Sequence, residues 1–81
     1  MSRSDQNTER ALTAIQRAFP RRTTRRKART GAPFVQIRTP RGQNLSVFYQ
    51  AKTRLFMVYE CGRQPLRLAT LSDLRAHVSG Q

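Results

Sequence analysis

The spacing of the apolar residues changes once along this sequence, and that change constrains the fold more than any other feature. Between Ser4 and Phe19 the apolar residues recur at helical spacing; they are Ala11, Leu12, Ile15, Ala18 and Phe19. From Pro33 onward the period is two, as in PFVQIRT, NLSVFYQ and RLFMVYE. A period near 3.6 residues indicates an amphipathic helix, and a period of two indicates strands with one buried face. The sequence therefore predicts an α+β fold, with a helix ahead of an antiparallel meander.

The chain of 81 residues has room for one small domain. We expect three parts within it: an N-terminal amphipathic helix at 1–20, a basic flexible linker at 21–32, and an antiparallel sheet with a C-terminal helix at 33–81. Ser4 or Asn7 can cap the first helix, and Pro20 ends it. Residues 21–32 contain no large apolar side chain and their like charges repel each other, so we expect nothing to hold them to a core.

The segment TPRGQ predicts the first hairpin and its register. Pro40 suits the first corner of a type I turn, and Gly42 suits the left-handed position that follows it. The resulting three-residue loop pairs Thr39 with Gln43. The pairs that follow are Val35 with Val47 and Ile37 with Leu45 on one side of the sheet, and Phe34 with Phe48 and Arg38 with Asn44 on the other.

The next loop, AKT, decides which side chains share a face with the first hairpin. If it is also a three-residue loop, the pairs are Val47 with Met57, Phe48 with Phe56 and Tyr49 with Leu55. One face then forms an apolar core of Val35, Ile37, Leu45, Val47, Tyr49, Leu55, Met57 and Tyr59. The other carries a row of phenylalanines, Phe34, Phe48 and Phe56. Such a row either stacks the bases of single-stranded nucleic acid or packs under a helix, and the second interpretation is favoured because two amphipathic helices need a sheet to cover.

Two short segments complete the expected fold. QPLRLAT can add a fourth, edge strand to the three-stranded meander. In TLSDLRAHV, Thr70 and Asp73 have a spacing that resembles a capping box, which predicts a short C-terminal helix with Leu71, Leu74 and Val78 on one side. His77 lies near the end of that helix, where we expect a surface or capping role.

The charge of the chain points to a polyanionic partner. Lys and Arg number 16 against 4 acids, which gives a net charge of +12, and 14 of the 16 are arginine. Guanidinium forms bidentate pairs with phosphate and stacks on bases, whereas ammonium acts as a hydrated point charge. We therefore predict a small, non-catalytic nucleic-acid-binding protein, with DNA slightly preferred over RNA.

The candidate nucleic-acid-binding residues fall into two groups. The expected phosphate contacts are the cations of the linker, Arg21, Arg22, Arg25, Arg26, Lys27 and Arg29. The expected base contacts cluster around the first hairpin and are Gln36, Arg38, Arg41 and Asn44, and Arg54 in the next loop adds a further cation. A solvated charge run without a ligand, and ordinary polar decoration of a hairpin, are the alternatives.

Two other functions stay open. The first is a phage- or plasmid-type inhibitor that docks on an acidic host protein through its basic surface or a free strand edge. The second is a small basic ribonuclease that uses a loose set such as Arg54, Tyr59, Glu60 and His77. Neither a nucleophile motif nor a phosphate loop supports an enzyme, so we expect no catalytic residues.

The remaining sequence features concern disulfides, metal sites and the location of the protein in the cell. Cys61 is the only cysteine, so we expect no disulfide and no multi-cysteine metal site, and nothing calls for a cofactor. The longest apolar run, from Leu55 to Tyr59, is far too short to cross a membrane, and the N-terminus lacks the apolar stretch of a signal peptide. We expect a cytoplasmic protein without a membrane partner, and the sequence does not specify its oligomeric state.

Overall fold

The structure is a computed structural model and describes residues 3–80. It consists of two helices and one antiparallel sheet with the strand order β1-β2-β3-β4-β5. The elements in chain order are α1 (Arg3–Ala18), β1 (Thr23–Lys27), β2 (Pro33–Arg38), β3 (Asn44–Gln50), β4 (Leu55–Tyr59), β5 (Leu66–Leu68) and α2 (Leu71–Ser79). The predicted α+β fold is confirmed, but the sheet has five strands rather than three or four. Because α1 begins at Arg3, neither Ser4 nor Asn7 caps its start.

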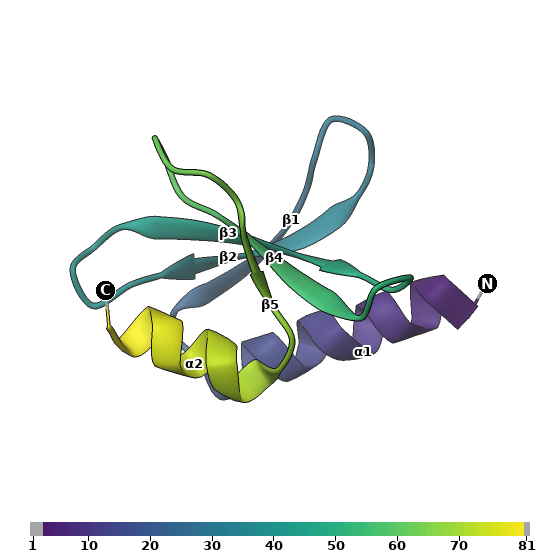
Figure 1. Ribbon diagram of the computed structural model, residues 1–81, viewed down its shortest axis with the longest axis horizontal. Coiled ribbons are helices and arrows are strands. Elements are labelled where there is room, and N and C mark those ends of the chain that lie inside the picture. The colour runs from purple at the N-terminus through teal and green to yellow at the C-terminus, as the bar shows by residue number, and fades with distance from the viewer. Residues whose placement is uncertain (1–2, 81) are drawn as a thin grey trace.

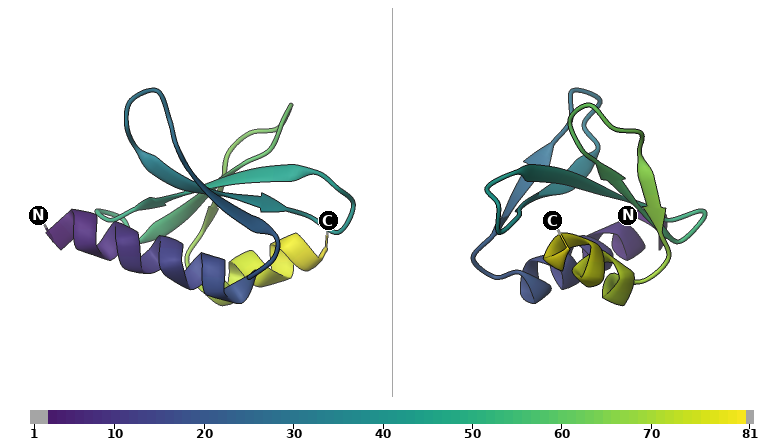
Figure 2. Two further views of the ribbon diagram at one scale, coloured as in Figure 1. Left: turned by 180° about the vertical axis from the view of Figure 1, so that it is seen from behind. Right: turned by 60° about the vertical axis from the view of Figure 1, so that its left-hand side comes forward.

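Both helices pack on the same face of the sheet (Figure 1). The apolar side of α1 supplies Leu12 and Ile15 to the core, and α2 supplies Leu74 and Val78. The sheet contributes a cluster of fully or nearly fully buried residues, Val35, Ile37, Leu45, Val47, Phe56 and Val58. The hydrophobic core thus lies between the sheet and the helices, and no helix within residues 3–80 covers the opposite face of the sheet (Figure 2).

The segment 21–32, expected to be a flexible linker, contains the edge strand β1. Its residues pair antiparallel with β2, for example Thr24 with Gln36 and Arg26 with Phe34. The hydroxyl of Thr23 donates to the carbonyl oxygen of Phe19 at 3.0 Å, which ties the start of β1 to the end of α1. The prediction was wrong because an edge strand needs no large apolar side chain when ladder hydrogen bonds and polar anchors hold it. Charges on such an edge also discourage pairing with another chain.

The first hairpin, between β2 and β3, confirms the predicted register. Val35 pairs with Val47 and Ile37 with Leu45. At the turn the backbone N–H of Thr39 donates to the carbonyl oxygen of Gln43 at 2.8 Å, and Gly42 has a φ of +86°. The hydroxyl of Thr39, a residue only 3% exposed, accepts from the Gln43 N–H at 3.1 Å and stabilises the same turn.

The second hairpin differs from the prediction by one residue. Its loop is 51–54, because Gln50 pairs with Leu55 and Tyr49 with Phe56. A shift of one residue exchanges the faces of a strand. The core face of β4 therefore carries Phe56 and Val58, and the expected core residues Leu55, Met57 and Tyr59 belong to the opposite face.

The C-terminal segments follow the sequence pattern. Leu66–Leu68 forms β5 at the edge of the sheet beside β4. The side chain of Thr70 caps α2 and accepts from the backbone N–H of Asp73 at 3.0 Å. This cap fixes the start of the helix, which buries Leu74 and Val78 against the core.

Candidate nucleic-acid interface

The helix-free face of the sheet, called here the open face, gathers aromatic and cationic side chains. Strand pairing and the alternation of side chains along each strand define its members. They are Thr24, Arg26, Phe34, Gln36, Arg38, Asn44, Ser46, Phe48, Gln50, Leu55, Met57, Tyr59 and Arg67. The loops 28–32 and 60–65 both rise from the sheet on this side, away from the helices (Figure 2).

A row of three aromatic rings crosses the middle strands of the open face. Phe34 and Phe48 stack with their ring centroids 4.7 Å apart, and Tyr59 meets Phe48 edge-on at 5.5 Å. The expected third member, Phe56, instead packs against Tyr49 at 5.1 Å, on the helix side. The favoured interpretation, that a helix covers the row, is wrong for Phe34 and Phe48, because both helices lie on the other face.

Exposed arginines surround this aromatic row. Arg26 lies on β1, Arg38 at the end of β2 and Arg67 on β5, and all three are exposed. Arg26 donates from Nη1 to Oε1 of Gln36 at 3.2 Å, so its guanidinium is held over the face. The open-face positions include no acid, so the electrostatic potential of these arginines is not offset on this face and attracts anions to it.

Five of the predicted site residues meet in one hollow at the corner of the open face. It measures about 280 Å³ and is lined by Arg21, Arg22, Thr23, Thr24, Gln36, Arg38 and Asn44. The N–H of Arg38 donates to the carbonyl oxygen of Arg22 at 2.8 Å, which joins the turn after α1 to the end of β2. Cations from the basic segment and amides from the first hairpin therefore form one surface. From the sequence alone, these residues were assigned to two separate groups.

Arg25 points the opposite way from its neighbour Arg26. Its guanidinium donates to both carboxylate oxygens of Glu9, at 3.0 and 2.9 Å, and to the Gln16 amide oxygen at 3.3 Å. The hydrogen bond from Arg25, and then its charge, lower the pKa of the Glu9 carboxyl from its ordinary value of 4.5. Arg25 thus anchors β1 on α1, with three of its five N–H donors bonded within the protein and its charge paired with Glu9.

The other predicted cations lie in exposed positions around the sheet. Lys27 ends β1 on the helix side of the strand, Arg29 lies in the loop 28–32, and Arg41 lies in the first hairpin. Arg54 has a φ of 56° in the loop 51–54 and lines a hollow on the helix side together with Arg10 and Tyr49. The structure does not bring Arg54 to the open face.

A second recess on the open face was missed by the sequence reasoning. It measures about 640 Å³ and is lined by Met57, Tyr59, Gln64, Pro65 and Arg67. Tyr59 was expected in the core because the loop before β4 was taken to have three residues. The loop has four, and its left-handed residue is Arg54, so no glycine or asparagine signals the longer turn.

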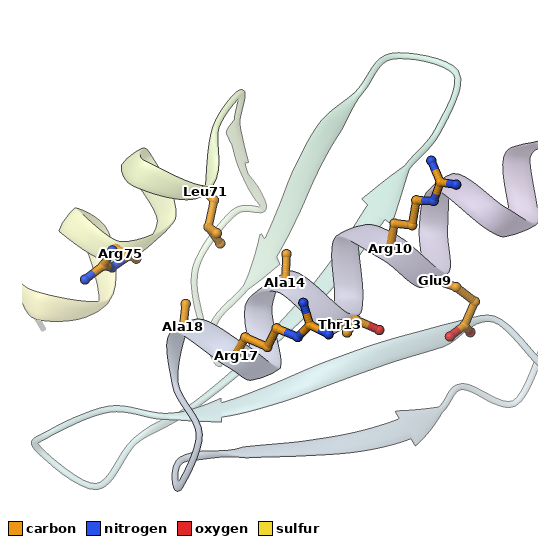
Figure 3. A pocket seen from close by; sticks show the side chains of 8 residues that line it. All are labelled: Glu9, Arg10, Thr13, Ala14, Arg17, Ala18, Leu71 and Arg75. Atoms are coloured by element: carbon orange, nitrogen blue, oxygen red, sulfur yellow. The ribbon is translucent and has the colours of Figure 1, made fainter.

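The helix side carries a different candidate surface, a groove between α1 and α2 of about 670 Å³. Ala14 and Ala18 of α1 and Leu71 of α2 point toward the space between the helices, with charged side chains at the edges (Figure 3). The cations of this groove are Arg10, Arg17 and Arg75. Glu9 also lines the groove, with its carboxylate paired to Arg25, so an apolar floor is combined with a rim in which cations outnumber the acid.

The residues of the ribonuclease alternative are only partly assembled. Oε1 of Glu60 lies 3.5 Å from Nε2 of His77, and Oε2 lies 3.6 Å from Nε of Arg63. Arg54 and Glu60 flank opposite ends of β4, however. Within residues 3–80, no group of three His, Cys, Asp or Glu side chains is placed to hold a metal ion. In the same range, neither helix is long and apolar enough to cross a membrane.

Comparisons of the chain with models of protein families, with curated proteins and with solved structures found no match. The function must therefore be inferred from the surfaces themselves.

Proposed function

We propose that this protein binds nucleic acid without catalysing a reaction, and that it does so through the open face. The observation that carries the proposal is the row Phe34, Phe48 and Tyr59, which no helix covers and which lies among Arg26, Arg38 and Arg67. Proteins that bind nucleic acid on a sheet combine aromatic rings for the bases with cations for the phosphates. The open face offers both.

The corner hollow supports the same proposal. Arg21, Arg22 and Arg38 lie there within reach of one ligand, beside the amides of Gln36 and Asn44. Arginine pairs with phosphate oxygens in bidentate fashion, and side-chain amides bond to base edges. A nucleic acid that crosses the aromatic row toward this corner would meet phosphate-binding and base-reading groups in succession.

The test compares two triple variants of equal charge by fluorescence anisotropy with single-stranded and duplex oligonucleotides. R26Q/R38Q/R67Q removes three exposed cations from the open face, and R10Q/R17Q/R75Q removes three from the helix side; each lowers the net charge from +12 to +9. We expect the open-face variant to lose at least about tenfold in affinity and the helix-side variant to stay near the wild type. Equal losses would mean that only net charge matters, and the proposal would then fail.

A second candidate function is docking on an acidic partner protein. The groove between α1 and α2 favours it, because an apolar floor with a rim of Arg10, Arg17 and Arg75 is complementary to an acidic amphipathic segment. The two functions separate on affinity for plain polynucleotide at physiological salt, which a dedicated protein-binding inhibitor need not show. Weak binding to single strands and duplexes alike, lost at that salt, would move the preference to this second function.

A further inference from the structure

The recess beside Tyr59 has the composition of a site for one unstacked nucleobase. Its walls come from the end of β4, the loop 60–65 and β5, so it adjoins the aromatic row. Its volume of about 640 Å³ lies within the range of roughly 300–1,000 Å³ that is usual for small-ligand sites. Met57, a residue only 5% exposed, supplies an apolar floor, and soft thioether side chains adapt well to flat rings.

Tyr59 is the side chain best placed to stack on a base. It is 40% exposed and is one of two large hydrophobic residues that stand out from the described surface in this way. Its edge-on contact with Phe48, at an interplanar angle of 83°, engages at most one face of the tyrosine ring. Phe48 is itself stacked on Phe34, so the ring of Tyr59 lies against a stacked pair, and its contact with Phe48 leaves at least one ring face unengaged by that pair.

Polar groups of the recess complement the parts of a nucleotide that lie outside the ring. Gln64 offers an amide donor and acceptor, the pair that bonds bidentately to an adenine edge. Arg67 is exposed on the neighbouring strand, opposite Met57, and can pair with the adjoining phosphate. Aromatic, amide and guanidinium groups therefore line one recess that is large enough to admit a base.

Resting on the proposed function, we infer that the open face takes single-stranded nucleic acid and that one unpaired base enters the recess and stacks on Tyr59. A base inside a duplex has both faces covered by its neighbours, so it cannot offer a face to a ring. The loops 28–32 and 60–65 rise from the sheet on this side, away from the helices (Figure 1). RNA and DNA share the stacking chemistry, so both are arms of the test.

The first experiment is an anisotropy titration with a labelled strand of about ten nucleotides, as single-stranded RNA, single-stranded DNA and duplex DNA. Tyr59→Leu removes the ring, Tyr59→Phe keeps it, and Leu66→Ala is the matched control, since Leu66 is 38% exposed on the next strand. We expect Tyr59→Leu to weaken binding to at least one single strand by roughly 5- to 150-fold, the equivalent of one lost stacking contact. Tyr59→Phe, Leu66→Ala and duplex binding should change little.

The second experiment observes the ring directly. The chain has two tyrosines and no tryptophan, so Tyr49→Phe leaves Tyr59 as the only strong intrinsic fluorophore. We expect single strands to quench the emission of Tyr59, because a base stacked on the ring deactivates its excited state. Duplex DNA should leave the emission unchanged. This measurement does not depend on how well Tyr59→Leu folds.

The outcomes separate the inference from the proposed function. Equal affinity for single strands and duplex, with no quenching and no effect of Tyr59→Leu, would overturn the base site but leave open-face binding intact if R26Q/R38Q/R67Q still weakens it. Absence of binding to all three polymers at physiological salt would overturn both. Quenching by one single strand together with loss of affinity in Tyr59→Leu supports the site and identifies the polymer.

Discussion

Arg25 shows how one residue converts a charged segment into part of the fold. Its contacts join Glu9 and Gln16 of α1 to a strand that has no apolar anchor of its own. Arg26, the next residue, points to the other face and bonds to Gln36. Alternation along β1 therefore divides the basic run into a side that anchors the strand on α1 and a side that belongs to the open face.

The pKa of Glu9 reports on this anchor. Arg25 lowers it by a hydrogen bond and by its charge, so Arg25→Gln should raise the Glu9 pKa toward its ordinary value of 4.5, whereas Arg26→Gln should leave it unchanged. Because the folded-state pKa is the lower one, the anchor contributes stability above the ordinary pKa and loses it as the pH falls through the folded value. An NMR titration of side-chain carboxyl carbons measures the Glu9 pKa in each variant, and urea unfolding at several pH values measures the change in stability. An unchanged Glu9 pKa in Arg25→Gln would contradict the anchor.

Burial of single side chains predicts a second contrast. Leu12 is fully buried between α1 and the sheet, whereas Leu66 is 38% exposed. Leu12→Ala should lower the free energy of unfolding by about 2–5 kcal/mol, since it leaves a cavity, and Leu66→Ala should cost less than about 1 kcal/mol. Urea denaturation followed by circular dichroism measures both. Similar losses in the two variants would place the core elsewhere.

At the scale of the elements, the two hairpins show what local sequence can specify. The first was predictable because Pro40 and Gly42 fit one turn type, and Gly42 occupies the left-handed conformation. The second was not, because the left-handed residue is Arg54 and nothing near it distinguishes a four-residue loop from a three-residue one. Because of this ambiguity, the sequence predicted Tyr59 in the core instead of on the open face, and it did not predict the recess that Tyr59 lines.

β1 was missed for a different reason. Its anchors join residues far apart in the chain, such as Glu9 and Arg25, and pairwise polar contacts of that kind leave no periodic signal. The cations of the candidate site were recognisable from composition alone. Which of these cations lie on which face could not be predicted without knowing that the segment is a strand, because side chains alternate between two faces only in a strand.

The pairing of β1 can be tested by amide hydrogen exchange. The Ala28 N–H donates to the Ala32 carbonyl at 2.9 Å, and hydrogen-bonded positions alternate along an antiparallel pair. The amides of Thr24 and Arg26 should therefore face β2 and exchange slowly, and those of Arg25 and Lys27 should face away and exchange quickly. Uniformly fast exchange across all four amides would mean that the segment is a flexible linker after all.

Across the molecule, the four acids lie away from the open face. Asp5 and Glu9 lie on α1, Asp73 lies on α2, and Glu60 follows the end of β4 beside Arg63 and His77. The helices therefore carry three of the four acids, and the charged side chains at the open-face positions are all arginines. Long-range electrostatic attraction consequently draws an anionic ligand toward the face on which the aromatic row is exposed.

This arrangement also limits how the basic segment can be tested. Deleting the residues before Ala32 would remove Leu12 and Ile15 from the core as well as β1 from the sheet. A loss of nucleic-acid affinity after such a deletion would follow from unfolding and would say nothing about the arginines. Arg→Gln substitutions at exposed positions remove charge without removing an element of the fold, so they isolate the electrostatic contribution.

The dependence of affinity on salt then measures how many open-face arginines contact phosphate. Each phosphate neutralised on a single strand contributes about 0.7 to the slope of log K against log salt, so R26Q/R38Q/R67Q should reduce the slope by about 2 if all three make contact. R10Q/R17Q/R75Q, with the same net charge, should keep the wild-type slope, because condensed counterions are released only where phosphates are bound. Anisotropy titrations over a salt series give all three slopes. If the helix-side variant flattens the slope instead, the phosphates lie along the α1–α2 groove, and the aromatic row must serve another ligand.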